Sequence, residues 1–164
     1  MIRAAVVTVS DRSFRKERAD ASGPAVAALL GTIPAAVEQE VVVPDVAAVI
    51  GRAIRHFADV LGMDLVVTTG GTGVDPRDVT PEATREAIDR EVPGMAEAMR
   101  AASQKSVPTA MLSRAVVGIR GTTLVVNLPG SPGGARDNLA VVLPVLVHAI
   151  GKIRGGGGDC APPA

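Results

Sequence analysis

Cysteine is almost absent from this sequence, because Cys160 is the one cysteine in 164 residues. An intramolecular disulfide and a metal site built from several cysteines are therefore both excluded. This cysteine usage is typical of a reducing compartment, so we predict a cytoplasmic location. No apolar run approaches the roughly 20 residues that a transmembrane helix needs, and the apolar stretch near the N-terminus is too short for a secretory signal. We expect a protein without a membrane segment.

A net charge is also missing, since 17 Lys and Arg residues balance 17 Asp and Glu residues and neither sign forms a long block. We therefore expect neither a broad nucleic-acid-binding surface nor a basic patch for lipid. The two aromatic residues are both phenylalanines, so the core is predicted to be aliphatic. We predict a single domain over residues 1–154 and a disordered Gly- and Pro-rich tail over residues 155–164.

The pattern that is present is an alternation of short apolar runs with longer segments of helical period. It is typical of an α/β protein whose parallel strands are covered by helices on both faces. The predicted strands cover residues 4–9, 37–43, 64–69, 114–119 and 122–128. The last two surround a tight turn, which predicts one antiparallel strand. The predicted helices begin near Pro24, Asp45, Pro81, Met95 and Ala135. Thr80 is predicted as the N-cap of the helix that begins at Pro81.

Polar loops follow four of the predicted strands, after Val9, Val43, Thr69 and Val126. In an open α/β sheet, ligands bind beyond the carboxyl ends of the strands. We therefore expect these loops to meet at one edge and to form the functional site.

The loop after the third strand, within TTGGTGVDPRDVTPEAT (residues 68–84), has the clearest chemical signal. Its glycines let successive backbone amides turn toward one anion, and the start of the next helix adds a partial positive charge. Arg77 and Asp78 add a cation and a Mg²⁺ ligand. Such a glycine run is often only a tight turn, and the sequence lacks the common NTPase and dinucleotide-binding fingerprints. A phosphate site here would be of another type.

The candidate side chains also have structural interpretations. Asp45 could be a helix N-cap, and Asp78 could pair with Arg77 or Arg85. The two histidines lack a second ligand at metal spacing, so we assign them core or surface roles. Two further residues could simply close a turn, namely Ser10 and Asp11.

Eight motifs follow one another along the chain: TVSD (8–11), DASG (20–23), VPD (43–45), TTGGTG with PRDVTPEAT (68–84), VPGMAEAMR (92–100), MLSR (111–114), GIRGTTLVVNLPGSPGG (118–134) and VLPVLVHAI (142–150). In this order they resemble the molybdopterin adenylyltransferases of molybdenum cofactor synthesis, the Mog and MoaB proteins. That family is related to the G domains of gephyrin and plant Cnx. The resemblance covers about residues 4–154.

The resemblance implies a three-layer α/β/α sandwich, a homotrimer, and transfer of AMP from Mg-ATP to the terminal phosphate of molybdopterin with release of pyrophosphate. Molybdopterin synthase and a molybdate-inserting enzyme are the implied pathway partners. A phosphomonoester is already an anion near neutral pH, so the reaction needs cations and oriented amides more than a strong base. Two alternatives are a non-catalytic molybdopterin-binding scaffold of the same fold and a general nucleotide-binding phosphotransferase.

The resemblance also implies roles for single residues. Asp45 and Asp78 match the functional aspartates of the family, which implies that both are catalytic and bind Mg²⁺; the presence of both favours the enzyme. The implied nucleotide- and substrate-binding residues, together with Arg77, are Ser10, Asp11, Gly70, Gly71, Thr72, Gly73, Pro129, Gly130, Ser131 and Pro132. Which loop contacts the pterin and which the adenine is left open.

Overall fold

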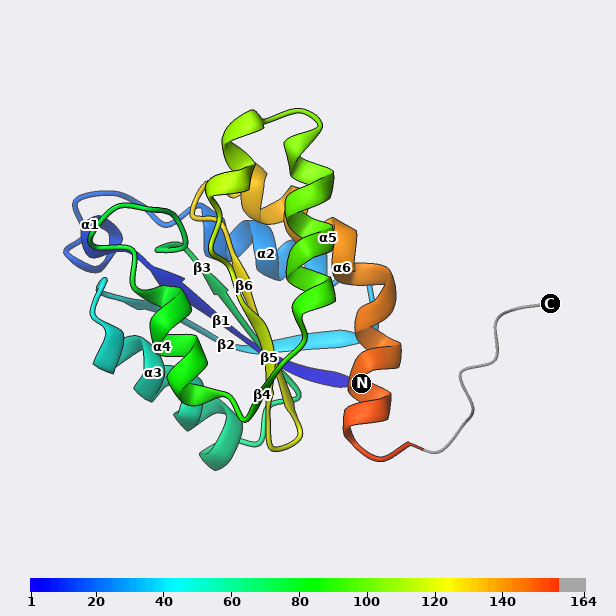
Figure 1. Ribbon diagram of the computed structural model, residues 1–164. Helices are drawn as coiled ribbons and strands as arrows, with labels where there is room; N and C mark the ends of the chain where they lie inside the picture. The colour runs from blue at the N-terminus through cyan, green and yellow to red at the C-terminus, as the bar shows by residue number, and fades with distance from the viewer. Residues whose placement is uncertain (157–164) are drawn as a thin grey trace.

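A six-stranded sheet with the order β2-β1-β3-β6-β5-β4 forms the middle of the molecule (Figure 1). The computed structural model describes residues 1–156. The strands are β1 (Ile2–Val9), β2 (Ala35–Val43), β3 (Leu65–Thr69), β4 (Arg90–Glu91), β5 (Val117–Arg120) and β6 (Thr123–Leu128). Neighbours among β2, β1, β3 and β6 pair in parallel, whereas β5 runs antiparallel to both β6 and β4. The predicted α/β class, with a mostly parallel sheet and one opposed strand, is confirmed.

Helices cover both faces of this sheet, which gives three layers (Figure 1). On one face lie α2 (Ser22–Leu30), α5 (Pro93–Gln104) and α6 (Pro132–Ile153). On the other lie α3 (Ala47–Arg55), its π-helical continuation η1 (His56–Val60) and α4 (Thr80–Ala87). The remaining short helices are α1 (Asp11–Phe14) and the 3₁₀ helix η2 (Pro108–Leu112). Within residues 1–156, no helix combines the length and apolar character needed to cross a membrane.

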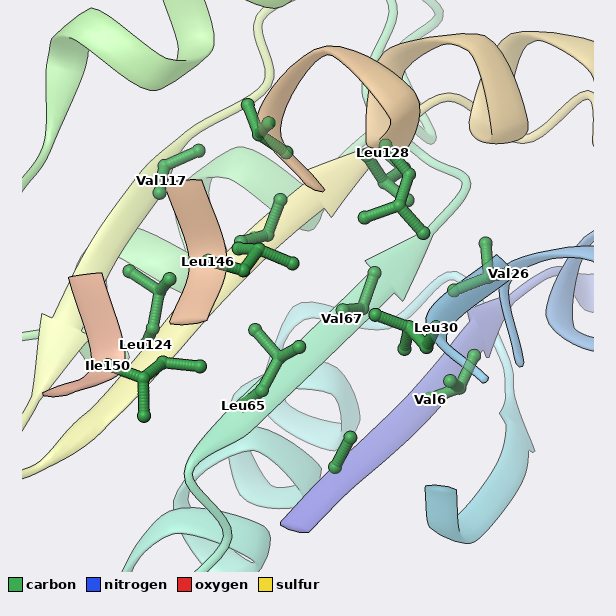
Figure 2. Close-up of a cluster of buried hydrophobic side chains, with 14 of the residues drawn as sticks. Val6, Val26, Leu30, Leu65, Val67, Val117, Leu124, Leu128, Leu146 and Ile150 are labelled. Atoms are coloured by element: carbon green, nitrogen blue, oxygen red, sulfur yellow. The ribbon is translucent and has the colours of Figure 1, made fainter. Parts of the chain in front are cut away.

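The two cores follow from the period-2 alternation of the strands, which sends successive side chains to opposite faces. Val6 and Val67 belong to the core under α2, α5 and α6, whereas their neighbours Val7 and Val66 belong to the core under α3 and α4. Figure 2 shows Leu146 of α6 facing apolar side chains of the strands. Burying one such side chain contributes about 1.5–3 kcal/mol, so this aliphatic packing holds the layers together.

The register of the parallel strands brings their carboxyl ends to one edge. Val9 pairs with Val43, and Thr69 pairs with both Thr8 and Leu128. The loops that follow β1, β2, β3 and β6 therefore begin side by side, as the sequence predicts. We call this the carboxyl edge of the sheet.

Several predicted boundaries differ from the structure. The sequence places a strand at residues 114–119, but β5 begins at Val117 because earlier backbone groups bond elsewhere: the Arg114 amide donates to the Thr72 carbonyl. The last strand ends at Leu128, where the predicted range 122–128 also ends, whereas the helix predicted from Asp45 begins at Ala47. Sequence periodicity misses three short elements, α1, β4 and η2. The predicted disordered tail at residues 155–164 lies largely outside the described residues.

Candidate functional site

Three adjoining hollows occupy the carboxyl edge. We call the loop between β3 and α4, residues 70–79, the glycine loop. The largest hollow, about 780 Å³, lies between the glycine loop, η2, α5 and the start of α6, and we call it the large cavity. The second, about 500 Å³, lies beside the end of β1 and the segment before α2, and we call it the β1 cavity. The third, about 260 Å³, is the aspartate hollow, which is lined by Ser10, Asp11, Arg12, Asp45, Asp75, Arg77 and Asp78.

These hollows share walls. The large cavity and the β1 cavity have Gly71, Gly130 and Ser131 in common. Asp78 lines both the large cavity and the aspartate hollow, and Asp45 lines both the β1 cavity and the aspartate hollow. Each sequence-predicted site residue lines at least one of the three, so the fold brings the complete predicted set together.

The glycine loop after β3 depends on two residues in the left-handed region. Gly70 has φ +108°, and a Cβ there would lie 2.2 Å from the Val9 carbonyl oxygen. Gly71 has φ +65°, and its Cβ would lie 2.5 Å from Thr80 Oγ1. Larger residues would therefore meet both backbone strain and a steric clash. Glycine is required at both positions because the loop passes close to the Val9 carbonyl and the Thr80 hydroxyl.

Thr80 holds this loop in a way that the sequence does not indicate. The predicted N-cap role is wrong, because the N-cap of α4 is Val79, without a side-chain cap. Instead the Thr80 hydroxyl donates to the Gly70 carbonyl at 2.8 Å, and its amide donates to the Gly71 carbonyl at 3.1 Å. The first residue of α4 therefore orders the glycine turn, in a buried position.

Asp45 joins the first loop to the second. Its Oδ2 accepts the Asp11 amide at 2.7 Å, and the Asp45 amide donates in return to Asp11 Oδ1 at 3.0 Å. The N-cap of α3 is Val46, so the N-cap interpretation of Asp45 is wrong. The other carboxylate oxygen, Oδ1, faces the glycine loop and lies 3.4 Å from the Cβ position of Gly71. Asp45 thus presents a half-buried carboxylate toward the glycine loop.

Ser10 and the start of α1 complete this side of the site. The Ser10 hydroxyl accepts the Ser13 amide at 3.2 Å and caps α1, so Ser10 has a local structural role. The Ser10 amide continues the sheet pattern by donating to the Val43 carbonyl at 2.9 Å. Ser10 therefore anchors the loop and also forms a wall of two hollows.

Asp78 ends the exposed part of the glycine loop. Its Oδ2 accepts the Asp75 amide at 2.9 Å, and the Asp78 amide donates to the Asp75 carbonyl at 2.8 Å. The predicted arginine partners are occupied elsewhere, because Arg77 pairs with Asp75 and Arg85 pairs with Glu91. The Asp78 carboxylate is thus oriented by the backbone rather than neutralised by a side chain.

The aspartate hollow is negative, since four carboxylates meet two arginines on its walls. The Asp75 hydrogen bond and charge, with further attraction from Asp11 and Asp45, raise the pKa of Arg77 above its usual value. In turn the Arg77 amide and guanidinium lower the pKa of Asp75. Arg77 and Asp75 therefore neutralise each other, and the remaining carboxylates outnumber Arg12, so the net negative charge of the hollow can attract a divalent cation. Among the described residues, no group of three or more His, Cys, Asp or Glu side chains could hold a metal ion.

The loop after β6 closes the site from the fourth side. The Thr69 hydroxyl donates to the Pro129 carbonyl at 2.7 Å, and a Cβ at Gly130 would lie 3.1 Å from the Gly70 Cα. Ser131 then caps α6 by accepting the Gly134 amide at 3.2 Å. The start of a 22-residue helix therefore lies against the large cavity, and its positive end favours an anion there.

Sequence reasoning missed some lining residues. Asp20 accepts the Thr8 hydroxyl at 2.6 Å and the Gly23 amide at 3.1 Å below the β1 cavity, and the DASG motif was a signal for it. In the large cavity, Asn138 donates to Ser103 Oγ at 3.0 Å. That pair joins α5 to α6, and no spacing along the chain reveals it.

Comparison with known proteins identifies the family. Residues 5–148 match the family model described as a probable molybdopterin binding domain. The chain belongs to this family. The match spans the whole carboxyl edge, from β1 to the large-cavity part of α6.

Members of the molybdopterin-binding domain family are similar to this chain over most of its length. A molybdopterin adenylyltransferase of Helicobacter pylori strain J99 is 40% identical over 157 residues, which is 94% of this chain and 89% of that protein. Gephyrin of Dictyostelium discoideum is 41% identical over 158 residues, 90% of this chain but 22% of gephyrin. The crystal structure of the molybdopterin biosynthesis enzyme MoaB of Thermus thermophilus superposes with a TM-score of 0.90 at 51% identity, covering 94% of this chain and 98% of that chain.

Proposed function

We propose that this protein transfers AMP from Mg-ATP to the terminal phosphate of molybdopterin, forming adenylylated molybdopterin and pyrophosphate in molybdenum cofactor biosynthesis. One observation carries the proposal: the two larger hollows share the wall formed by Gly71, Gly130 and Ser131. Two substrates bound in separate cavities would therefore meet over the glycine loop. The molybdopterin adenylyltransferase name of a relative 40% identical over 94% of the chain supports this chemistry.

The residues at the shared wall suit a reaction between two phosphates. The glycine loop and the start of α6 direct backbone amides and a positive helix end toward anions. The terminal phosphate of molybdopterin is itself the nucleophile, so this chain needs no strong general base. Its main task is to align the acceptor phosphate with the α-phosphate of ATP. Such alignment accounts for a large part of the rate acceleration in phosphoryl transfer.

The donor set at the aspartate hollow fits Mg²⁺ bound together with a nucleotide. Mg²⁺ usually takes one or two carboxylates and completes its octahedron with water and substrate phosphates. Asp45 and Asp78 line this hollow, and the backbone hydrogen bonds of each leave the carboxylate charge unneutralised. When bound, Mg²⁺ would screen the charge between donor and acceptor phosphates. We assign Asp45 and Asp78 as its protein ligands.

Further parts of the proposal concern assembly and cellular context. We propose that residues 1–154 act as one domain, in a cytoplasmic homotrimer. Two exposed valines of α6, Val145 and Val147, are apolar surface that a neighbouring subunit could cover. The substrate requires a source, molybdopterin synthase, and the activated product requires an enzyme that inserts molybdate. Light scattering of the purified protein tests the trimer.

The deciding experiment incubates purified protein with molybdopterin and Mg-ATP and follows both adenylylated molybdopterin and pyrophosphate. Stoichiometric formation of the two products supports the proposal. Tight molybdopterin binding without product would overturn it in favour of a binding-only scaffold. Turnover of ATP in the absence of any pterin would favour a general nucleotide-binding phosphotransferase.

A further inference from the structure

Arg114 lies behind the glycine loop, in the irregular segment between η2 and β5. Its Nε donates to the Gly73 carbonyl at 2.7 Å, and its Nη2 donates to the Asp78 carbonyl at 2.6 Å. The third nitrogen, Nη1, forms an ion pair with Glu82 in the first turn of α4. All three guanidinium nitrogens are therefore used, each on a different residue.

Two of these contacts hold the two ends of one loop. Residues 74–77, between Gly73 and Asp78, are exposed, and the hydrogen bonds of Asp75 with Asp78 and Arg77 are local to the loop. Such local bonds keep the shape of the loop but not its place on the protein. Arg114 joins both ends to the body of the molecule, so it restrains where the Asp78 carboxylate lies.

The backbone around Arg114 strengthens the link to the cavity wall. The Arg114 amide donates to the Thr72 carbonyl at 2.8 Å, and the preceding Ser113 lines the large cavity, as does Thr72. The wall of the large cavity and the loop that ends at Asp78 are thus connected through one residue. Glu82 keeps this connection charged, because burial raises the pKa of its carboxyl but the hydrogen bond from Arg114 lowers it further, to a net value below the usual one.

We propose that Arg114 is a positioning residue for Asp78, which sets the place of that carboxylate relative to the substrate phosphates. The inference rests on the proposed function for its kinetic consequence, but not for its structural one. A planar guanidinium can bind two carbonyls and a carboxylate at the same time, whereas a lysine ammonium cannot reproduce this fork. Replacement of Arg114 should therefore slow transfer without removing the groups that line the large cavity.

The test compares Arg114→Met and Arg114→Lys with the matched control Arg85→Met. Arg85 lies on the same side of the molecule and pairs with the exposed Glu91 outside the three hollows. Misplacement of a reacting group by about 1 Å lowers the reaction rate roughly 100-fold, so we expect Arg114→Met to lower kcat by about that factor. We expect the KM for molybdopterin to change by less than about threefold, because the substitution removes no interaction that binds the ground state and the transition state equally. The kcat of Arg114→Lys should lie between those of Arg114→Met and the unmodified protein. The kcat of Arg85→Met should equal that of the unmodified protein.

Amide hydrogen exchange on the same proteins measures the positioning directly. We expect faster exchange at residues 73–78 in Arg114→Met, with β3 and β6 unchanged. Unchanged exchange in the loop, or an unchanged kcat, would overturn the inference. Equal acceleration of exchange in the strands would also overturn it, because it would indicate a general structural role.

The inference can still be tested if Arg114→Met fails to fold or if no protein is active. If Arg114→Met does not fold, Glu82→Gln removes the charge that holds the guanidinium, and we expect a smaller fall in kcat, roughly three- to tenfold, with the same local change in exchange. If no protein forms adenylylated molybdopterin, the proposed function fails. The exchange at residues 73–78 still decides whether Arg114 places the loop.

Discussion

The two ends of the parallel strands use aspartate in opposite ways. At the amino ends, Asp64 is 8% exposed, accepts the Arg3 amide at 2.7 Å and pairs with the Arg154 guanidinium. At the carboxyl ends, Asp45 and Asp78 accept backbone amides, and neither belongs to an ion pair within residues 1–156. An arginine cancels the charge of the first aspartate, whereas backbone amides orient the other two and leave their charge for a ligand. Aspartate charge is thus neutralised by arginine at one edge of the sheet and left without a cationic partner at the other.

The largest effect should come from removing a charge at the carboxyl edge. Asp78→Asn keeps an acceptor for the Asp75 amide, so we expect the free energy of unfolding to change by less than about 1 kcal/mol. Loss of an oriented charge from a phosphate site should lower the rate of adenylylated molybdopterin formation by roughly 100-fold or more. Product formation and thermal unfolding are measured on the same preparation. Full activity in this variant would contradict the proposed role of Asp78 as a metal ligand and weaken the contrast between the edges.

The geometry of the carboxyl edge is tested by Gly70→Ala. Gly70 has φ +108°, and the added Cβ would lie 2.2 Å from the Val9 carbonyl oxygen. Backbone strain of this kind costs about 1–3 kcal/mol, and the clash adds to it, so we expect a loss of at least about 2 kcal/mol in urea unfolding. A variant as stable as the unmodified protein would show that the loop moves freely.

The amino edge is tested by Asp64→Asn, which should change stability but not chemistry. Burial raises the pKa of Asp64, but hydrogen bonds from the Arg154 side chain and the Arg3 amide lower it more, so the net pKa in the folded protein is below its usual value. The variant weakens the contact between the buried side chain at position 64 and the exposed Arg154, and we expect a loss of about 1–3 kcal/mol in the free energy of unfolding at neutral pH with kcat unchanged. A fall in kcat comparable to that of Asp78→Asn would contradict the division between the edges.

The same residue predicts a direction for the effect of pH. Because the pKa of Asp64 is lower in the folded chain than in the unfolded chain, the unfolded state binds the proton first as the pH falls. Its stabilising contribution is therefore complete above about pH 4 and is lost below that value. Urea unfolding across the acid range should show a shallower loss of stability in Asp64→Asn than in the unmodified protein.

The smallest expected effect comes from a glycine far from the carboxyl edge. Gly151 lies in α6, and a Cβ there would meet no atom within 4 Å. Alanine should stabilise the helix by about 0.5–1 kcal/mol, and activity should not change. This variant is the control for Gly70→Ala. The same substitution should raise the free energy of unfolding at Gly151, where the backbone allows a side chain, and lower it at Gly70. Destabilisation at Gly151 would mean that α6 has a neighbour on this face.

Prediction from the sequence succeeds for the parts of the site that lie within one segment. The continuous apolar runs predict β1, β3 and β6, and the glycines at 70, 71 and 73 predict a tight loop at the end of β3. Both signals are local, because an apolar run and a left-handed turn depend on residues next to one another. The family resemblance adds Asp45 and Asp78, and the structure brings these two residues to the same hollow.

Prediction fails where distant segments hold one another. The predicted N-cap role of Thr80 is wrong because its hydroxyl finds a carbonyl ten residues earlier, on Gly70. The predicted strand at residues 114–119 starts late because the Arg114 backbone and side chain bond to the glycine loop. In each case a tertiary partner competes successfully with the local pattern.

By itself, the sequence determined the α/β class, the aliphatic core and the edge at which the polar loops would gather, because hydrophobic period and turn chemistry are properties of consecutive residues. The tertiary structure alone decided how the aspartates are held. Asp11 and Asp45 exchange hydrogen bonds across 34 positions, and Arg114 reaches Gly73 across 41. Contacts over such separations leave no period along the chain, so only packing of the whole sheet brings the two partners together.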